Sequence, residues 1–366
     1  MNFSRRANWN TPTNRLTLAR QLRGSDVLDL TETNPTRAAI DYPLDALADA
    51  MARGSRAMYS PDPRGLISAR EALAGQLRCS PDDLVLTAST SEAYAFLFKL
   101  LCDPGDAIAM PAPSYPLLEH LSALESVSIR PYPLEFHRRW EISSIPKDVR
   151  LIVIINPNNP TGSFVSASEQ DAIAKRGQPI ISDEVFLDYP LEGSGRSLVR
   201  DDILTFVLGG LSKSAGLPHF KLAWIRVCGP ANLKRDAIAA LELIADHFLS
   251  VSTPVQAALP DLLEIAPEIH SAIAARIRGN LDHLRSAAIP SVQVLPVEGG
   301  WSAVLRIPNT ESDEDFALRL IERDGVAVHP GYFFDFETDG HLVISLLTDP
   351  GIFDEGVRRL LSAIPR

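Results

Sequence analysis

The stretch "LIVIINPNNPTG", Leu151 to Gly162, joins a short apolar run to a segment of asparagine, proline and glycine. Every residue of the run Leu151–Ile155 is aliphatic, so a strand formed here would bury both of its faces. The segment that follows, Asn156–Gly162, is rich in residues that fix turns. A fully apolar strand with a rigid turn at its carboxyl end is typical of a parallel sheet that helices cover on both sides.

Four further apolar runs of this kind lie along the first two thirds of the chain. They are Leu84–Ala88, Ala107–Met110, Pro179–Ser182 and Leu204–Leu208. Amphipathic stretches such as Ser91–Leu101 and Ser166–Arg176 lie between them. This alternation predicts an α/β fold, with a large domain over residues 42–252 that contains a mostly parallel sheet.

The last hundred residues have a different pattern. A helical region of about residues 254–288 leads into the short runs "VQVLPV", "WSAVLRI", "GVAVHP" and "LVISLL", with one more helix among them. This order predicts a smaller α+β domain. We expect residues 1–41 and 253–366 to form it together.

Composition restricts the class of protein. The chain has 366 residues, which is enough for two domains, and 46 acidic against 35 basic residues give a net charge of −11. This charge argues against nucleic acid or an anionic membrane surface as a partner. The cysteines Cys79, Cys102 and Cys228 form neither a disulfide framework nor a zinc pattern. With no signal-peptide core at the start, we expect a cytoplasmic protein without a metal site.

Charged residues follow two of the apolar runs, where ligands bind in open α/β sheets. Asp183 comes directly after Pro179–Ser182, and a carboxylate at the end of a buried strand is costly unless it meets a cation or a donor. Lys213 follows Leu204–Leu208, in the stretch "GGLSKSAGLPHFKLAWI". Taken alone, Lys213 is better explained as an ordinary surface charge than as a reactive amine, because most lysines are surface charges.

Small hydroxyl residues follow a third run. Ser89, Thr90 and Ser91 come after Leu84–Ala88 and open a predicted helix. Hydroxyl and free backbone N–H groups at a helix N-terminus bind anions. Simple capping of the helix explains the same residues equally well.

Three motifs together resemble a known family. "NPNNPTG", "SDEVF" and "LSKSAGLP" occur in this order, with 24 residues from Asn159 to Asp183 and 30 from Asp183 to Lys213. In order and spacing the chain resembles the class I/II aminotransferases, which are fold-type-I enzymes dependent on pyridoxal 5'-phosphate. The resemblance extends from about Leu28 to the C-terminus. Three motifs in register make a reactive lysine the preferred interpretation.

The resemblance implies roles for the residues of these motifs. Lys213 would hold the cofactor covalently and later move a proton as the catalytic base. Asp183, also catalytic, would pair with the ring nitrogen, Asn159 would donate to the ring 3-oxygen, and Tyr115 would stack on the ring.

The resemblance also implies residues that bind the phosphate and the substrate. Thr90, Ser91, Ser212 and Lys221 would hold the phosphate, and Tyr59 would reach the phosphate of the neighbouring subunit in a homodimer with shared active sites. Asn34 and Arg37 are the predicted substrate-binding residues, because the N-terminal segment borders the site in relatives. A solvated loop charge is an equally good interpretation of Arg37.

The chain departs from the family pattern at three positions. Phe186 replaces the usual tyrosine of the aspartate motif. Lys221 replaces an arginine, and a lysine cannot form arginine's bidentate fork. Val343 stands where many relatives have the arginine that binds the substrate α-carboxylate, and there is no arginine between Asp324 and Glu355.

The resemblance implies an enzyme that transfers an amino group between an amino acid or an amine and a 2-oxo acid. A pyridoxal-phosphate-dependent lyase or decarboxylase acting on an amino acid is the alternative, because the same residues serve those reactions. A non-catalytic pyridoxal-phosphate-binding protein is a further alternative, which the retained lysine disfavours.

Overall fold

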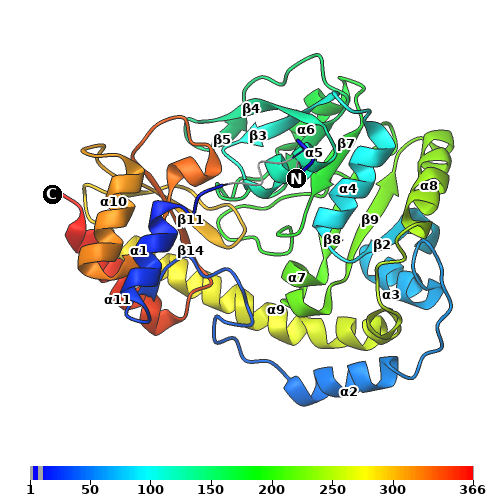
Figure 1. Cartoon of the computed structure of the whole chain (residues 1–366), viewed down its shortest axis with the longest axis horizontal. Coiled ribbons are helices and arrows are strands. Elements are labelled where there is room, and N and C mark those ends of the chain that lie inside the picture. Colours follow the sequence, from blue (N-terminus) through cyan, green and yellow to red (C-terminus); the bar gives the residue numbers. More distant parts are fainter. Residues whose placement is uncertain (1–2, 7–10, 366) are drawn as a thin grey trace.

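A computed structural model describes residues 3–6 and 11–365 (Figure 1). Within these residues an eight-stranded sheet has the order β2-β9-β8-β7-β6-β3-β4-β5. Its strands are β2 (Leu84–Thr87), β3 (Ala107–Ala112), β4 (Ser128–Phe136), β5 (Trp140–Ile142), β6 (Ile152–Ile155), β7 (Ile180–Asp183), β8 (Thr205–Gly210) and β9 (Ala223–Cys228). All pairings are parallel except those that β9 and β5 make. The mostly parallel sheet predicted from the apolar runs is confirmed.

Helices cover both faces of this sheet because successive side chains of each strand point to opposite sides. Val153 and Ile155 of β6 belong to an apolar cluster with residues of α4 (Thr90–Leu101) and α8 (Ala231–Asp246). Ile152 and Ile154 face the other way, into a cluster with Ile173 of α6 (Ala167–Ala174). The strand is therefore buried on both sides, as its uninterrupted apolar sequence predicts.

A second, antiparallel sheet is built from the last third of the chain. Its strands are β10 (Gln293–Val294), β11 (Ser302–Arg306), β14 (His341–Ser345) and β13 (His329–Pro330), in that order. A short parallel pair, β1 (Leu28–Asp29) with β12 (Val326–Ala327), joins the N-terminal segment to this part. The helices α1 (Arg15–Arg23), α10 (Asp313–Arg319) and α11 (Pro350–Ala363) gather beside these strands in Figure 1.

The long helix α9 (Thr253–Ala287) connects the two parts. It contacts α2 (Leu44–Gly54) and α3 (Ile67–Leu77), and it also contacts α11. Figure 1 shows it running beneath the larger sheet toward α11. We propose that residues 42–252 form one domain and that residues 1–41 and 253–366 form the other.

Short elements complete the fold. These are α5 (Leu117–Leu124), α7 (Leu211–Ser214), the 3₁₀ turns Pro81–Asp83, Pro218–Phe220 and Gly331–Phe334, and a π turn at Leu320–Asp324. In the described part of the chain, none of the helices combines the length and the apolar character needed to cross a membrane.

Candidate active site

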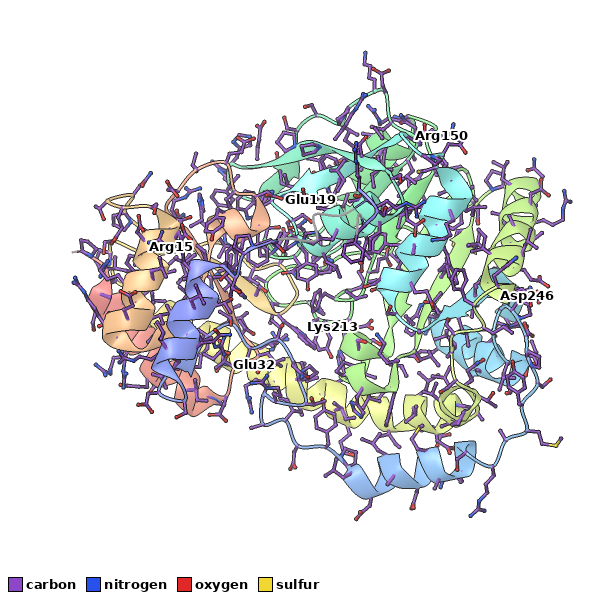
Figure 2. All side chains as sticks on the ribbon, viewed as in Figure 1. Arg15, Glu32, Glu119, Arg150, Lys213 and Asp246 are labelled. Atoms are coloured by element: carbon purple, nitrogen blue, oxygen red, sulfur yellow. The ribbon has the colours of Figure 1, made fainter. Side chains whose placement is uncertain are left out.

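A cavity of about 340 Å³ lies beyond the carboxyl ends of the parallel strands, between the two sheets. Asp183 of β7 lines one side of it, and Ser302 of β11 with Val343 of β14 lines another. The cavity brings together eight of the predicted site residues: Thr90, Ser91, Tyr115, Asn159, Asp183, Ser212, Lys213 and Lys221. In Figure 2 Lys213 lies near the centre of the molecule, with Glu32 of the N-terminal segment below it.

Lys213 is held by the backbone around it. It lies on the short helix α7, directly after strand β8, where the hydroxyl of Ser214 donates to the carbonyl of Gly210 at 3.0 Å. The hydroxyl of Tyr189 donates to the carbonyl of Lys213 at 2.8 Å. The Nζ atom lies 3.5 Å from the carbonyl oxygen of Thr33. Lys213 therefore presents its amine to the cavity from a fixed turn.

The environment of Lys213 favours its neutral amine. Burial lowers the pKa of Lys213 to about 8, although the carboxylates of Asp183 and Glu32 oppose this shift. At pH 7 roughly a tenth of the amine is then neutral, against a negligible fraction for an ordinary lysine. A neutral amine in a cavity is a nucleophile, and after protonation it is a general acid.

Asp183 is a buried carboxylate whose charge is only partly compensated. The hydroxyl of Tyr94 donates to its Oδ2 at 3.0 Å, and the N–H of Val185 donates to its Oδ1 at 3.3 Å. Burial nevertheless raises the pKa of Asp183 to about 6, against these two hydrogen bonds and the charge of Lys213. A cationic ring nitrogen placed in the cavity would supply the charge that Asp183 lacks.

Tyr94 is a site residue that the sequence reasoning missed. Its side chain is 3% exposed and lines the cavity from α4. In the sequence it stands among apolar residues of a helix, so it resembles a core aromatic. It lies four residues after Thr90, and residues at this spacing share one face of a helix. This spacing from Thr90, a predicted anion-binding residue, is the sequence feature that could have identified Tyr94 as a site residue.

We expect Tyr94→Phe to weaken cofactor binding about tenfold. A hydrogen bond to a charged group contributes about 1.5–3 kcal/mol, and its loss leaves Asp183 less able to stay ionised beside the cofactor. Absorbance titration of the apoprotein with cofactor measures the affinity. Tyr132→Phe is the matched control, because this buried tyrosine donates only to the carbonyl of Val153 at 2.8 Å. Equal effects of the two substitutions would contradict the role of Tyr94.

One end of the cavity is suited to a phosphate. Thr90 and Ser91 occupy the first turn of α4, and Ser212 lies opposite. Among the described residues, no side chain or backbone group forms a hydrogen bond with these three hydroxyls. The side chain of Lys221 lines the same cavity. Among the described residues it has no salt-bridge partner. Free donors at a helix N-terminus beside a cation form an anion site.

The middle of the cavity is suited to a flat ring. The side-chain oxygen of Asn159 accepts from the hydroxyl of Ser302 at 3.4 Å, so its amide N–H groups stay available. Tyr115 lines the cavity and is half-exposed. Phe186 packs edge-on against Trp301, with ring centroids 5.3 Å apart. Trp301, like Tyr94, was missed because a buried aromatic residue in a strand region resembles core packing.

Three predicted residues lie outside the cavity. Tyr59 is 72% exposed and lines a separate shallow hollow with Leu249. The guanidinium Nε of Arg37 lies 3.2 Å from a carboxylate oxygen of Glu32, in a neighbouring hollow. Asn34 accepts hydrogen bonds from the N–H and hydroxyl of Thr36, at 3.1 and 2.8 Å. The binding roles of Tyr59, Arg37 and Asn34 stay predictions.

Comparison with known proteins identifies the family. Residues 25–364 match the family model "Aminotransferase class I and II", so the chain belongs to the class I and II aminotransferases. Glutamate-pyruvate aminotransferase AlaA of Haemophilus influenzae is 27% identical over 95% of this chain and 93% of its own length. Nicotianamine aminotransferase 1 of Oryza sativa is 29% identical over 88% of this chain and 71% of its own.

The fold is shared with solved aminotransferases. The alanine aminotransferase from Pyrococcus furiosus superposes with a TM-score of 0.86 at 23% identity, over 96% of this chain and 99% of that one. The predicted fold class and the predicted enzyme class are confirmed: the protein is an aminotransferase.

Proposed function

We propose that this aminotransferase binds pyridoxal 5'-phosphate in the cavity and holds it covalently through Lys213. The observation that carries the proposal is a buried lysine and a buried, under-compensated aspartate in one cavity whose far end is a helix N-terminus. When bound, the cofactor supplies an aldehyde that condenses with amines and a ring that accepts the electron pair left when a substrate carbon loses a proton.

The residues of the cavity fit each part of this cofactor. Thr90, Ser91, Ser212 and Lys221 offer unused donors and a cation for the phosphate. Asp183 offers its carboxylate to the ring nitrogen, and Asn159 offers an amide N–H to the ring oxygen.

Lys213 performs the proton transfers at the substrate. Because its pKa is about 8, the amine is neutral often enough to accept a proton from the substrate carbon and acidic enough to return it. Asp183 holds a proton on the ring nitrogen, which keeps the ring able to accept electrons. Trp301 and Phe186 surround the Nζ atom, at 4.8 and 5.5 Å from their ring centroids, and limit its access to water.

The reaction we propose is transfer of an amino group between an amino acid or amine and a 2-oxo acid. A lyase or decarboxylase uses the same lysine and aspartate but breaks a different bond of the substrate. Family membership favours amino transfer. Incubation of the purified holoenzyme with amino donors and a 2-oxo acid, followed by product analysis, separates these reactions. Stoichiometric formation of a new oxo compound and a new amino acid supports transfer, whereas release of ammonia or carbon dioxide supports the alternative.

We further propose a homodimer in which Tyr59 reaches the partner's cofactor phosphate. Tyr59 belongs to an exposed apolar patch that we define as Met58, Tyr59, Phe248 and Leu249, of which Tyr59 and Leu249 line one hollow. The ring of Phe248 lies 5.2 Å from that of Phe96, which lines the same hollow as Tyr59. Exposed apolar residues that gather in this way are typical of an interface.

The three unpaired cysteines support our proposal of a cytoplasmic location.

The dimer has a direct test. We expect the double variant Phe248→Asp, Leu249→Asp to raise the dimer dissociation constant at least about thirtyfold, because buried apolar anchors contribute about 2 kcal/mol or more. Sedimentation velocity measures the change, and cofactor affinity should fall with it as Tyr59 leaves the partner's site. Leu22→Asp, an exposed leucine on α1 outside the patch, is the control. A double variant that remains dimeric would place the interface elsewhere.

A further inference from the structure

Val343 has a neighbour on the adjacent strand whose side chain can bind an anion. His329 of β13 pairs directly with Val343 of β14 in the antiparallel sheet, and both residues line the cavity. Directly paired residues project their side chains from the same face of a sheet. The imidazole of His329 therefore leaves the sheet about 5 Å from the point where an arginine at position 343 would leave it.

This part of the sheet is connected to the reactive amine. Ser345 lies two residues after Val343, on the same face of β14. Its hydroxyl donates to the carbonyl of Glu32 at 2.6 Å. The next carbonyl along the chain, that of Thr33, lies 3.5 Å from the Nζ atom of Lys213. The paired strands and the amine therefore border the same end of the cavity.

The ring nitrogens of His329 are free to bind a ligand. Among the described residues, the imidazole contacts the rings of Phe333 and Phe334, with centroids 5.7 and 5.8 Å away, but forms no hydrogen bond. Neither nitrogen belongs to the fully buried atoms without a partner, so both keep accessible surface. A neutral imidazole has one N–H donor and one acceptor nitrogen. His329 thus presents an unused donor at the cavity wall.

The imidazole of His329 is neutral in the free site. Burial lowers its pKa to about 4; the carboxylate of Asp29 opposes this shift and the cation of Arg20 adds to it. On α10, which also contacts β13, the carboxylate of Asp313 accepts from backbone N–H groups within residues 331–341. No positive charge on the ring therefore has to be neutralised before a ligand binds.

A bound carboxylate changes the protonation of this ring. An opposite charge within about 4–6 Å moves a pKa by about 1–3 in favour of the charged form. A carboxylate that accepts the N–H of His329 therefore raises the pKa of the imidazole above its value of about 4. Because the protonated ring attracts the carboxylate more strongly, binding becomes tighter as the pH falls from about 7.5 to about 5.5.

We propose that His329 binds the carboxylate of the amino donor and of the 2-oxo acid by donating a ring N–H to it, in the place that an arginine at position 343 would take. This assignment rests on the proposed function, because it concerns the substrates of that reaction. A single N–H replaces the two parallel hydrogen bonds of an arginine fork. Carboxylate binding here is therefore weaker than at an arginine, and its strength depends on pH.

A ligand that cannot react tests the assignment without turnover. 3-Phenylpropionate carries a carboxylate but no amino group, and its Kd is measured from the absorbance of the holoenzyme at about pH 5.5 and about pH 7.5. We expect the wild type to bind it about two- to fourfold more tightly at the lower pH. We expect His329→Phe to weaken binding about tenfold or more and to remove this pH dependence, because phenylalanine has neither the donor nor the titrating group.

His341→Phe is the matched control. His341 is a buried histidine of the same sheet, its Nδ1 lies 3.0 Å from the carbonyl of Thr338, and it is not among the residues that line the cavity. This variant should bind 3-phenylpropionate as the wild type does. A wild-type affinity that is equal at both pH values, or that His329→Phe changes by less than about twofold, would overturn the proposal.

Donors with and without a carboxylate separate binding from packing. His329→Phe is expected to raise the KM of phenylalanine about tenfold or more and to leave 2-phenylethylamine within about twofold, because the amine has no carboxylate to lose. His329→Asn and His329→Gln each restore an amide N–H. At least one of them should recover part of the affinity for phenylalanine. Equal losses for both donors in His329→Phe would show that His329 acts only through packing.

The remaining outcomes identify another anchor or a failed function. If Arg37→Ala raised the KM of phenylalanine and His329→Phe did not, Arg37 would be the carboxylate anchor. If 3-phenylpropionate binding were lost in the monomeric double variant but retained in His329→Phe, the anchor would belong to the partner subunit. If neither donor changed the absorbance of the cofactor and borohydride fixed no cofactor to the protein, the proposed function itself would fail. A working transaminase that is insensitive to His329→Phe contradicts the assignment of His329 alone.

Discussion

Replacing Lys213 with alanine is expected to lower kcat by about 10⁴-fold or more, the largest effect of any single substitution in this chain. The substitution removes both the covalent attachment of the cofactor and the base that moves the substrate proton, and a positioned base alone contributes about 10²–10⁴-fold. Steady-state transfer rates with saturating cofactor measure the loss. The cofactor should still bind, because Asp183 and the phosphate-binding end of the cavity remain.

Lys221→Ala is the control for this variant. It removes a cation from the same cavity, so it should weaken cofactor affinity but retain turnover at saturating cofactor. Turnover of Lys213→Ala within tenfold of the wild type would mean that another amine performs the chemistry.

Asp183→Asn is expected to lower kcat by about 10²–10⁴-fold. Removing one partner of a buried ion pair costs about 3–5 kcal/mol, and here the cost falls on the protonated ring nitrogen. The exposed Asp246→Asn on α8 is the control for the loss of one carboxylate. Normal turnover of Asp183→Asn would show that Asp183 does not hold the ring proton.

The same substitution should stabilise the apoprotein at high pH. The pKa of Asp183 is raised from 3.8 to about 6 on folding, so the folded state prefers the protonated carboxyl. The free energy of unfolding of the wild type therefore falls as the pH rises from about 4 to about 6. The Asp183→Asn variant has no carboxyl group at this position and does not show this decrease. Above pH 6 we expect a gain of about 1–3 kcal/mol, which disappears near pH 4. Chemical denaturation at both pH values measures it, and parallel profiles for the two proteins would contradict the raised pKa.

The parallel strands could be predicted from the sequence because a strand that is buried on both faces consists of an uninterrupted run of apolar residues. The runs at Leu151–Ile155 and Pro179–Ser182 lie within one residue of β6 and β7. Strand β4 was not predicted, since the prolines in "SIRPYPLEF" and its several exposed residues hide a strand near the sheet edge. Strand β9 (Ala223–Cys228) was also not among the predicted runs, and an apolar run would not have shown that it is antiparallel to its neighbours.

One run was assigned to a single strand and forms two. "GVAVHP" divides into β12, which pairs with β1, and β13, which pairs with β14. The partners of each half come from opposite ends of the chain, and local patterns do not encode such pairings.

The site residues also include some that the sequence could predict and some that it could not. Asp183, Lys213 and Asn159 could be predicted because each follows a buried strand, where ligands bind in α/β sheets. Tyr94 and Trp301 could not, because a buried aromatic residue that lines a cavity has the same sequence pattern as one that packs in the core. The contacts that distinguish them depend on tertiary structure.

Borohydride reduction of the purified protein with pyridoxal 5'-phosphate tests the central claim most directly. Reduction converts the carbon–nitrogen bond between cofactor and lysine into a stable secondary amine, and peptide mapping then locates the label. We predict one pyridoxyl group per chain, on Lys213. A label on Lys221 or another lysine, or cofactor bound without any label, would contradict the assignment of Lys213 as the residue that holds the cofactor.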